Sequence, residues 1–494
     1  MFELEEVAQR VEVPKNLKKT DITYDLIKPF AKAHIYYNKG ELVYELIEPK
    51  LNKKERLMFE KIYQGLLQLI DFSPMQIESQ KKLISYLEDK LKSLLKEYGY
   101  KISSKQYDKI MYFIYRDFVG LNEIEPLMHD DYIEDINCNG INTEIYIKHR
   151  LFGNVKTNIK YEDLNKLKNF IIKLAQRCNK YITYSNPFLE GSLEDGSRVE
   201  GTISEEISPR GPNFSIRKFR RIPFSPTEVI FLKTISADAL AYLWYLVEHQ
   251  ANILIIGGAG SGKTTLLNVI STFIPSEAKI VSIEDTREIR LYHENWIATV
   301  CRESVGGLKI GEVDLNKLLR ESFRENPDYV IVGEVRGKET YVMFQGMASG
   351  HPTLSTFHSE DLSSVISRLK TPPINLPTSL IELLDVIITI VKVERKGKLF
   401  RKVKKIEEFL RVDERTGRVE TNTILSFDPS KNKFTYNLES KILEKISINQ
   451  GIKIDEIKKE IQKRKKFLLD LVKKKIFDLH LVQKEIEKYY LGLS

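Results

Sequence analysis

Residues 253–265 read I-L-I-I-G-G-A-G-S-G-K-T-T, and this stretch decides the fold of the second half of the chain. The four apolar residues predict a short buried strand, the glycines a tight turn, and the Lys-Thr-Thr sequence the start of a helix. Glycines let backbone N–H groups turn inward around a phosphate at the positive end of that helix. The order of strand, glycine turn and helix therefore predicts a phosphate-binding loop.

Each residue type in this loop fits a part of a nucleoside triphosphate. Lys263 can reach the β- and γ-phosphate oxygens, and the Thr264 hydroxyl can bind Mg²⁺. The alternative, a glycine turn that only joins a strand to a helix, does not require lysine and threonine at this spacing. We therefore expect ATP and Mg²⁺ as ligands, held by Gly257, Gly258, Ala259, Gly260, Ser261, Gly262, Lys263, Thr264 and Thr265.

The composition limits the class of protein. The 494 residues correspond to about three domains. The net charge of +8 comes from a mixture of 77 basic and 69 acidic residues, which is not typical of a dedicated nucleic-acid binder. The three cysteines form no C-x-x-C pair, so neither a disulfide framework nor a four-cysteine zinc site is expected, and a reducing compartment fits.

No segment of the sequence indicates export or membrane insertion. The amino terminus, M-F-E-L-E-E, is acidic, unlike a signal peptide, and no apolar stretch reaches the roughly 18 residues of a spanning helix. We therefore expect a cytoplasmic protein that reaches the inner face of the cell membrane only through partners or through its surface.

Composition and periodicity divide the chain into four segments. In the first, a strand-rich start precedes helical patterns with apolar residues spaced by three and four. Two prolines, Pro223 and Pro226, oppose any continuous element and indicate a linker. The predicted segments are 1–118, a mostly helical partner or regulatory region, 119–221, a second α/β domain, 222–236, the linker, and 237–494, the nucleotide domain with a basic helical tail.

The nucleotide segment alternates apolar strand patterns with helical patterns. This alternation is typical of a mainly parallel sheet with helices on both faces, and it predicts an α/β fold. A basic hairpin-like stretch spans residues 391–403. The tail from Lys441 has 14 basic and 8 acidic residues, which we expect mostly on a solvated face, with attraction to a membrane surface as the alternative. The expected strands are 252–256, 279–283, 298–301, 329–333 and 353–357.

Adjacent carboxylates follow the second of these strands. Residues 280–288 read I-V-S-I-E-D-T-R-E, so Glu284 and Asp285 end an apolar strand at the edge where α/β proteins bind ligands. One carboxylate there can orient or deprotonate the attacking water while another organises Mg²⁺. A strand that ends in Glu-Asp is also common in simple turns, but its place after the phosphate loop favours the catalytic interpretation.

Another carboxylate follows the apolar strand Y-V-I-V at residues 329–332. The sequence continues G-E-V-R, so Glu334 is expected just past the strand, suited to bind Mg²⁺ directly or through water. Ordinary Walker B strands end in Asp or Asp-Glu, and Gly-Glu is an unusual variant of that pattern. The alternative is an exposed glutamate in a turn.

Residues 346–358 read G-M-A-S-G-H-P-T-L-S-T-F-H and place His351 and His358 at opposite ends of one expected strand. Because no cysteine or third histidine lies nearby in the sequence, a zinc site is not expected. A lone histidine commonly makes a hydrogen bond in a core. At this point in a nucleotide domain we favour a role in sensing the state of the phosphates.

Taken together, these segments resemble the type II/type IV secretion ATPase superfamily. The phosphate loop, I-E-D-T, P-D-Y-V-I-V-G-E-V-R and G-H-P-T-L-S-T-F-H are similar to its Walker A, Asp-box, Walker B and His-box, in order and in spacing. The resemblance is greatest to the archaeal branch, which drives archaellum rotation and assembly of type IV-like pili, and it covers about residues 120–410. The four-cysteine zinc module typical of bacterial pilus-assembly and type II secretion members has no counterpart in this sequence.

The resemblance implies roles for single residues. It makes Glu284 the catalytic carboxylate, assigns Glu334 to magnesium, and places His351 and His358 in the His-box. It also implies that arginines of the preceding domain reach the phosphates, and guanidinium groups suit spread phosphoryl charge. The candidates for that role are Arg198, Arg210 and Arg217, with a solvated basic loop as the alternative.

The resemblance further implies a fold, partners and a function. The fold is a RecA-like P-loop nucleotide domain preceded by an α/β (PAS-like) domain. The assembly is a homo-hexamer that acts through an integral membrane platform protein on a pilin-like filament. The leading expectation is a Mg²⁺-dependent ATPase that assembles a type IV pilus-like filament, and the archaellum motor is the alternative.

Two other classes of protein stay open. A RecA-like nucleic-acid motor would need a basic, aromatic-lined groove, and the basic stretch at residues 210–221 does not exclude it, although no nucleic acid is expected as a partner. A nucleotide-gated scaffold without turnover is disfavoured because both carboxylate segments are intact.

Overall fold

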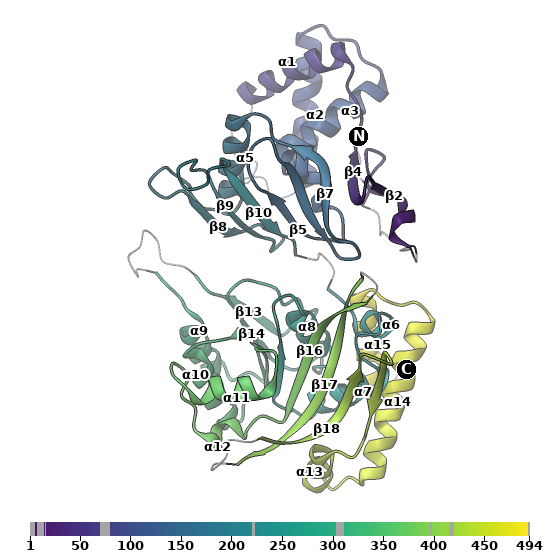
Figure 1. Ribbon diagram of the computed structural model, residues 1–494, viewed down its shortest axis with the longest axis vertical. Coiled ribbons are helices and arrows are strands. Elements are labelled where there is room, and N and C mark those ends of the chain that lie inside the picture. Colours follow the sequence, from purple (N-terminus) through teal and green to yellow (C-terminus); the bar gives the residue numbers. More distant parts are fainter. Residues whose placement is uncertain are drawn as a thin grey trace. The chain divides into compact units, whose positions relative to one another are not determined.

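The computed structural model describes residues 5–6, 14, 16–69, 80–219, 223–302, 311–395, 398–413 and 419–492. The chain folds into two compact units, Met1–Arg220 and Arg221–Ser494, each with its own sheet (Figure 1). Each unit also has its own apolar core. Within the described ranges, no helix combines the length and the apolar character that crossing a membrane requires.

The first unit is built on a ten-stranded sheet. Its strands are β1 (Glu5–Glu6), β2 (Asp21–Lys28), β3 (Ala31–Asn38), β4 (Glu41–Ile47), β5 (Ile133–Cys138), β6 (Glu144–His149), β7 (Gly153–Lys160), β8 (Phe188–Ser192), β9 (Arg198–Thr202) and β10 (Asn213–Arg217). They lie in the order β1-β2-β3-β4-β7-β6-β5-β10-β9-β8. All neighbours are antiparallel except β4 and β7, which pair in parallel.

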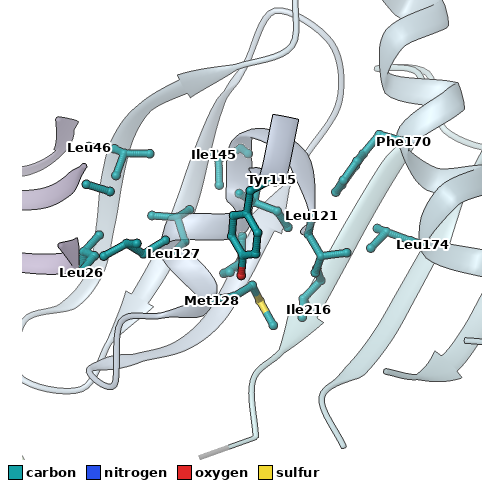
Figure 2. Close-up of a cluster of buried hydrophobic side chains, with 14 of the residues drawn as sticks. Leu26, Leu46, Tyr115, Leu121, Leu127, Met128, Ile145, Phe170, Leu174 and Ile216 are labelled. Atoms are coloured by element: carbon teal, nitrogen blue, oxygen red, sulfur yellow. The ribbon is translucent and has the colours of Figure 1, made fainter. Parts of the chain in front are cut away.

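The helices of the first unit share a single apolar core with this sheet. They are α1 (Lys53–Leu69), α2 (Gln80–Glu97), α3 (Ser104–Ile114), α4 (Glu125–Met128) and α5 (Leu164–Arg177), with short 3-10 or π segments at η1 (Leu17–Lys19), η3 (Tyr115–Val119) and η4 (Asn122–Ile124). Figure 2 shows part of this core, in which Leu26 and Leu46 belong to the same cluster as Phe170 and Leu174 of α5. The domain boundary predicted after residue 118 differs from the structure. Strand β4 precedes this position and β7 follows it, and the two strands pair within one sheet. This pairing satisfies the N–H and C=O groups at the edge of β4.

The second unit contains a nine-stranded sheet. Its strands are β11 (Ile253–Gly257), β12 (Ile280–Glu284), β13 (Trp296–Val300), β14 (Tyr329–Val335), β15 (Thr353–His358), β16 (Val386–Arg395), β17 (Lys398–Val412), β18 (Val419–Asp428) and β19 (Lys433–Tyr436). They lie in the order β13-β12-β14-β15-β11-β16-β17-β18-β19. The strands from β13 to β16 in this order are parallel, and β17, β18 and β19 continue the sheet antiparallel.

Helices cover both faces of this second sheet. Along β11, Ile253 and Ile255 belong to one buried cluster and Leu254 and Ile256 to another, because successive side chains of a strand point to opposite faces. The first cluster includes side chains of α6 (Pro226–Phe231), α7 (Ala237–Glu248), α8 (Lys263–Ser271), α13 (Lys441–Gln450), α14 (Ile454–Lys473) and α15 (Leu479–Tyr490). The second includes α9 (Leu315–Arg324), α10 (Glu339–Ala348), α11 (Leu362–Lys370) and α12 (Thr378–Ile381). The predicted α/β fold with a mainly parallel sheet is confirmed.

The five strands expected in the nucleotide domain are all present, each within two residues of its expected bounds. Residues 223–236 differ from the linker predicted there. Pro226 stands in the first turn of α6, where a helix does not need the proline N–H, and Ser225 caps that helix. Val229 is buried and the Thr227 hydroxyl donates to the Ile476 carbonyl at 2.6 Å, so this segment is packed into the second unit.

Candidate active site

The phosphate loop connects the end of β11 to the start of α8. Gly260 and Gly262 have φ angles of 62° and 100°, in the left-handed region that favours glycine. Helix α8 begins at Lys263, and no side chain caps its N-terminus. The first N–H groups of α8 therefore have no side-chain cap and could bind an anion.

Lys263 and Glu334 face each other at this loop. The Lys263 Nζ lies 3.6 Å from the Glu334 Oε1 and 3.5 Å from the Gly258 carbonyl oxygen. The His358 Nδ1 lies 4.0 Å from the same Glu334 oxygen. Side chains from the loop, β14 and β15 thus meet at the carboxyl edge of the parallel strands, where α/β proteins bind ligands.

Glu334 lies within β14 rather than just past its end. The pairing of β14 with β15 changes register between Val332 and Val335. Such an irregularity re-aims the side chains of the residues inside it. The sequence pattern does not reveal this irregularity, which explains the difference from the expected position.

Glu284 is the last residue of β12 and is buried, with 2% of its surface exposed. Its Oε1 accepts hydrogen bonds from the backbone N–H groups of Glu288 and Ile289, at 2.8 and 2.9 Å. Burial raises the pKa of Glu284 to about 7, although the two backbone hydrogen bonds act in the opposite direction. A carboxylate whose pKa lies near neutrality is suited to general-base chemistry.

The neighbouring carboxylate, Asp285, is held by other groups. The Arg336 Nη2 lies 2.7 Å from the Asp285 Oδ2, and the Cys301 thiol lies 3.5 Å from the other carboxylate oxygen. Burial and the Asp285 charge raise the pKa of Cys301 to about 12, so this thiol stays protonated. The Asp285–Arg336 pair links the ends of β12 and β14. The sequence motifs did not predict this ion pair.

The structure separates the two histidines of the predicted His-box. His358 ends β15 and is the direct neighbour of Gly257 on β11. His351 precedes β15 at the opposite edge of the sheet, where its Nδ1 lies 3.3 Å from the Gly346 carbonyl oxygen and its ring 5.0 Å from that of Phe323. Because each strand residue advances about 3.3 Å, the intervening strand keeps His351 away from the phosphate loop.

The three candidate arginines all lie in the first unit. Arg198 and Arg217 are direct cross-strand neighbours on β9 and β10. Arg210 lies in the loop at the other end of these strands, where its carbonyl accepts from the N–H of Ile141. The structure therefore brings Arg198 and Arg217 together and keeps Arg210 apart from them.

The residues beside the loop fit a magnesium ion that arrives with a nucleotide. Within the described ranges, no group of three His, Cys, Asp or Glu side chains could hold a metal without other ligands. Mg²⁺ in nucleotide sites takes one or two protein oxygens and completes its shell with phosphates and water. The Thr264 hydroxyl, in the first turn of α8, and the Glu334 carboxylate would supply those protein oxygens.

The sequence motifs did not predict two basic residues that lie beside the loop. Lys392 on β16 and Arg401 on β17 both contact the glycines of the phosphate loop. The basic stretch 391–403 was visible in the sequence. Its contact with the loop depends on the pairing of β16 with β11, which no local pattern encodes.

Comparison with known proteins identifies the family. The family model for the type II/IV secretion system protein matches residues 121–427. An uncharacterized protein of Methanocaldococcus jannaschii is 34% identical to this chain, over 96% of the chain and 90% of that protein. The chain therefore belongs to the type II/IV secretion system protein family, and the resemblance inferred from the motifs is confirmed.

More distant similarities extend to bacteria. The conjugal transfer protein TrbB of Rhizobium radiobacter is 32% identical, over 43% of this chain and 65% of TrbB. Among solved structures, the ATPase DotB of Yersinia pseudotuberculosis is 15% identical with a TM-score of 0.40, over 78% of this chain and 94% of that one.

Proposed function

We propose that this chain is a Mg²⁺-dependent ATP hydrolase of a secretion or pilus-type system. The proposal is carried by the convergence of Lys263 and Glu334 at the phosphate loop, with Glu284 buried at the end of the neighbouring strand β12. Membership in the type II/IV secretion system protein family supports the same conclusion.

Each of these groups has a task in hydrolysis. The loop N–H groups and Lys263 bind the β- and γ-phosphates, and Glu284 accepts a proton from the attacking water. Mg²⁺, held at Thr264 and Glu334, would neutralise charge that develops on the phosphates. The His358 Nδ1 lies 4.0 Å from the Glu334 Oε1, so His358 would respond to a change in the partner of that carboxylate.

The work performed is assembly of a type IV pilus-like filament. In this proposal the chain forms a homo-hexamer at the inner face of the cell membrane and acts through an integral membrane platform protein. The family resemblance implies that Arg198, Arg210 and Arg217 reach the phosphates, either within one chain or from a neighbouring subunit of the hexamer. The archaellum motor is the alternative, because the same site serves either task.

Phosphate release from Mg·ATP by the purified chain tests the enzymatic proposal. Lys263→Ala should lose nucleotide binding, whereas Glu284→Gln should bind ATP and release no phosphate. Lys466→Ala, an exposed lysine on α14, is the matched control and should behave as the unmodified chain. Turnover at the unmodified rate by Glu284→Gln would refute the catalytic assignment.

A stimulation assay separates the filament motor from a nucleic-acid motor. We expect turnover to rise with a soluble fragment of the platform protein or with anionic vesicles, and not with single-stranded DNA. A rise with DNA alone would instead favour the nucleic-acid motor. Mass measurement with a non-hydrolysable ATP analogue tests the expected hexamer.

A further inference from the structure

The pairing between β12 and β14 ends just before the residues that carry the two carboxylates of the site. The last paired residues are Ile283 of β12 and Val332 of β14. Glu284 is the next residue of β12, and Glu334 lies two residues further along β14. The regular parallel ladder therefore does not extend to the positions that set the distance between these carboxylates.

Hydrogen bonds at this edge hold each strand end to its outer neighbour in the sheet. The Cys301 N–H donates to the Glu284 carbonyl at 2.9 Å, which joins the end of β12 to the residue after β13. The Thr356 hydroxyl donates to the Gly333 carbonyl at 2.7 Å, which joins β14 to β15. Neither contact joins the end of β12 to the end of β14.

An ion pair makes that connection. The Arg336 Nη2 lies 2.7 Å from the Asp285 Oδ2. Asp285 directly follows Glu284 in the sequence. Arg336 lies two residues after Glu334. The pair therefore joins the two backbones immediately after both carboxylates.

The backbone that carries Arg336 is held by a further carboxylate, Glu339, in the first turn of α10. The Glu339 Oε1 accepts hydrogen bonds from the N–H groups of Arg336 and Gly337, at 2.7 and 2.6 Å. A carboxylate at this end of a helix is also favoured by the helix dipole. The Arg336 side chain therefore extends toward Asp285 from a turn with a defined geometry.

Both carboxylate oxygens of Asp285 have protein donors. Arg336 contacts Oδ2, and the Cys301 thiol lies 3.5 Å from Oδ1. The raised pKa of Cys301 keeps this thiol protonated, so it can donate to the carboxylate. To bind Mg²⁺, Asp285 would have to exchange one of these donors for the metal. The geometry therefore favours a role in positioning over a role as a metal ligand.

We propose that the Asp285–Arg336 pair is a positioning device that sets the distance between the carboxylates of β12 and β14. One carboxylate accepts the proton of the attacking water and the other holds Mg²⁺, so a small error in their separation would slow the reaction. This inference rests on the proposed function, because it takes Glu284 and Glu334 as parts of an ATPase site. The Arg336 side chain is 65% exposed, and exposed ion pairs contribute little to stability, so loss of the pair should affect turnover rather than folding.

Steady-state hydrolysis of Mg·ATP by the full chain tests the proposal. Asp285→Ala and Arg336→Ala should each lower kcat by about tenfold, because the carboxylates are misplaced. The KM for Mg·ATP should stay within about twofold, because the phosphate loop is unchanged. Melting curves should be close to that of the unmodified chain. Arg324→Ala, which removes the exposed ion pair with Glu321 on α9, is the matched control and should keep the unmodified kcat.

Two further variants separate a pair that acts as a unit from two residues that act alone. The double variant Asp285→Ala with Arg336→Ala should have about the same kcat as either single variant, because each substitution already breaks the pair. Arg336→Lys, which keeps the positive charge, should recover part of the lost kcat. Losses that multiply in the double variant overturn the proposal. A higher Mg²⁺ requirement confined to Asp285→Ala also overturns it, since that result makes Asp285 a metal ligand.

The outcomes distinguish this inference from the ATPase assignment. Normal turnover by the unmodified chain with unchanged kcat in both single variants overturns the positioning role and leaves the ATPase intact. Absence of phosphate release by the unmodified chain overturns both. If melting shows that an alanine variant does not fold, Asp285→Asn, which keeps the shape of the side chain and removes its charge, decides by the same kcat and KM measurement.

Discussion

Gly333 lies directly against Glu284: a Cβ at residue 333 would come within 3.1 Å of the Glu284 Cγ. Carbon atoms in favourable contact are about 3.5–4.0 Å apart, so a side chain at residue 333 would push the Glu284 side chain by a few tenths of an ångström. This contact gives a physical reason for Gly-Glu at a strand end where other nucleotide-binding proteins carry an acidic residue. The glycine lets the carboxylates of Glu284 and Glu334 lie on the neighbouring strands β12 and β14.

We therefore expect Gly333→Ala to impair catalysis more than folding. The added methyl group would displace the Glu284 carboxylate from its backbone donors, and a misplaced catalytic group costs about tenfold or more in kcat. Phosphate-release kinetics and thermal melting measure the two effects separately. Normal kcat in a folded Gly333→Ala protein would contradict this account.

The burial of Glu284 predicts a pH-dependent stability. Its pKa is about 7 in the folded chain and near 4.5 when unperturbed, so the folded state binds this proton more tightly than the unfolded state. The stability from this proton is fully present below about pH 4.5 and is lost as the pH rises toward 7. Glu284→Gln should remove that loss and exceed the unmodified chain in unfolding free energy at about pH 8 by up to about 3 kcal/mol.

Urea unfolding at about pH 5 and pH 8 measures this difference. The advantage of Glu284→Gln should shrink toward the lower pH, while the exposed Glu277→Gln should show no such trend. An equal difference at both pH values would mean that Glu284 is not titrating in this range.

The two histidines should behave differently when removed. His358 lies at the Glu334 carboxylate, so His358→Ala should lower kcat/KM by about tenfold. His351 lies at the far edge of the sheet against Phe323, so His351→Ala should cost about 1 kcal/mol of stability and leave kcat within about twofold. Steady-state kinetics with matched melting curves check both, and a catalytic defect confined to His351→Ala would reverse the assignment.

Of the three candidate arginines in the first unit, we expect Arg198 and Arg217 to act together and Arg210 to act independently. Arg198 and Arg217 are cross-strand neighbours, so their substitutions should be non-additive in a double-mutant cycle of kcat/KM. Arg210 lies at the other end of the strands, and its substitution should add independently to either of the others. A coupling energy above about 1 kcal/mol between Arg210 and Arg198 would contradict the geometry.

The basic tail is anchored by a buried arginine. The Arg464 Nη2 lies 2.5 Å from Glu248 and its Nε 3.1 Å from Glu460, with the guanidinium 5.0 Å from the centre of the Trp244 ring. Removing one partner of a buried ion pair typically costs about 3 kcal/mol, so Arg464→Met should strongly lower the unfolding free energy. Adding Glu248→Gln should recover part of the loss, whereas the exposed Lys466→Met should have little effect. Equal stability of Arg464→Met and the unmodified chain would show that the tail is held by apolar packing alone.

The sequence by itself determined the features that depend on neighbouring residues. Strands that are buried on both faces of a parallel sheet are continuous apolar runs. Each of the five expected strands, including Ile253 to Ile256, could therefore be predicted from its own residues. The phosphate loop could also be predicted from its own residues, because its glycines and Lys263 lie close together in the sequence. The sequence also predicted that Glu284 and Glu334 lie near the carboxyl ends of two strands, although Glu334 lies within β14 rather than past its end.

Only the tertiary structure decided the features that depend on long-range pairing and burial. Arg401 reaches Gly260 from 141 residues away along the chain, and β4 joins β7 across the division that was expected after residue 118. The raised pKa of Glu284 comes from desolvation by the surrounding elements, which a linear pattern does not contain. His351 shares a motif with His358 but lies at the opposite edge, because a strand separates in space what the sequence places close together.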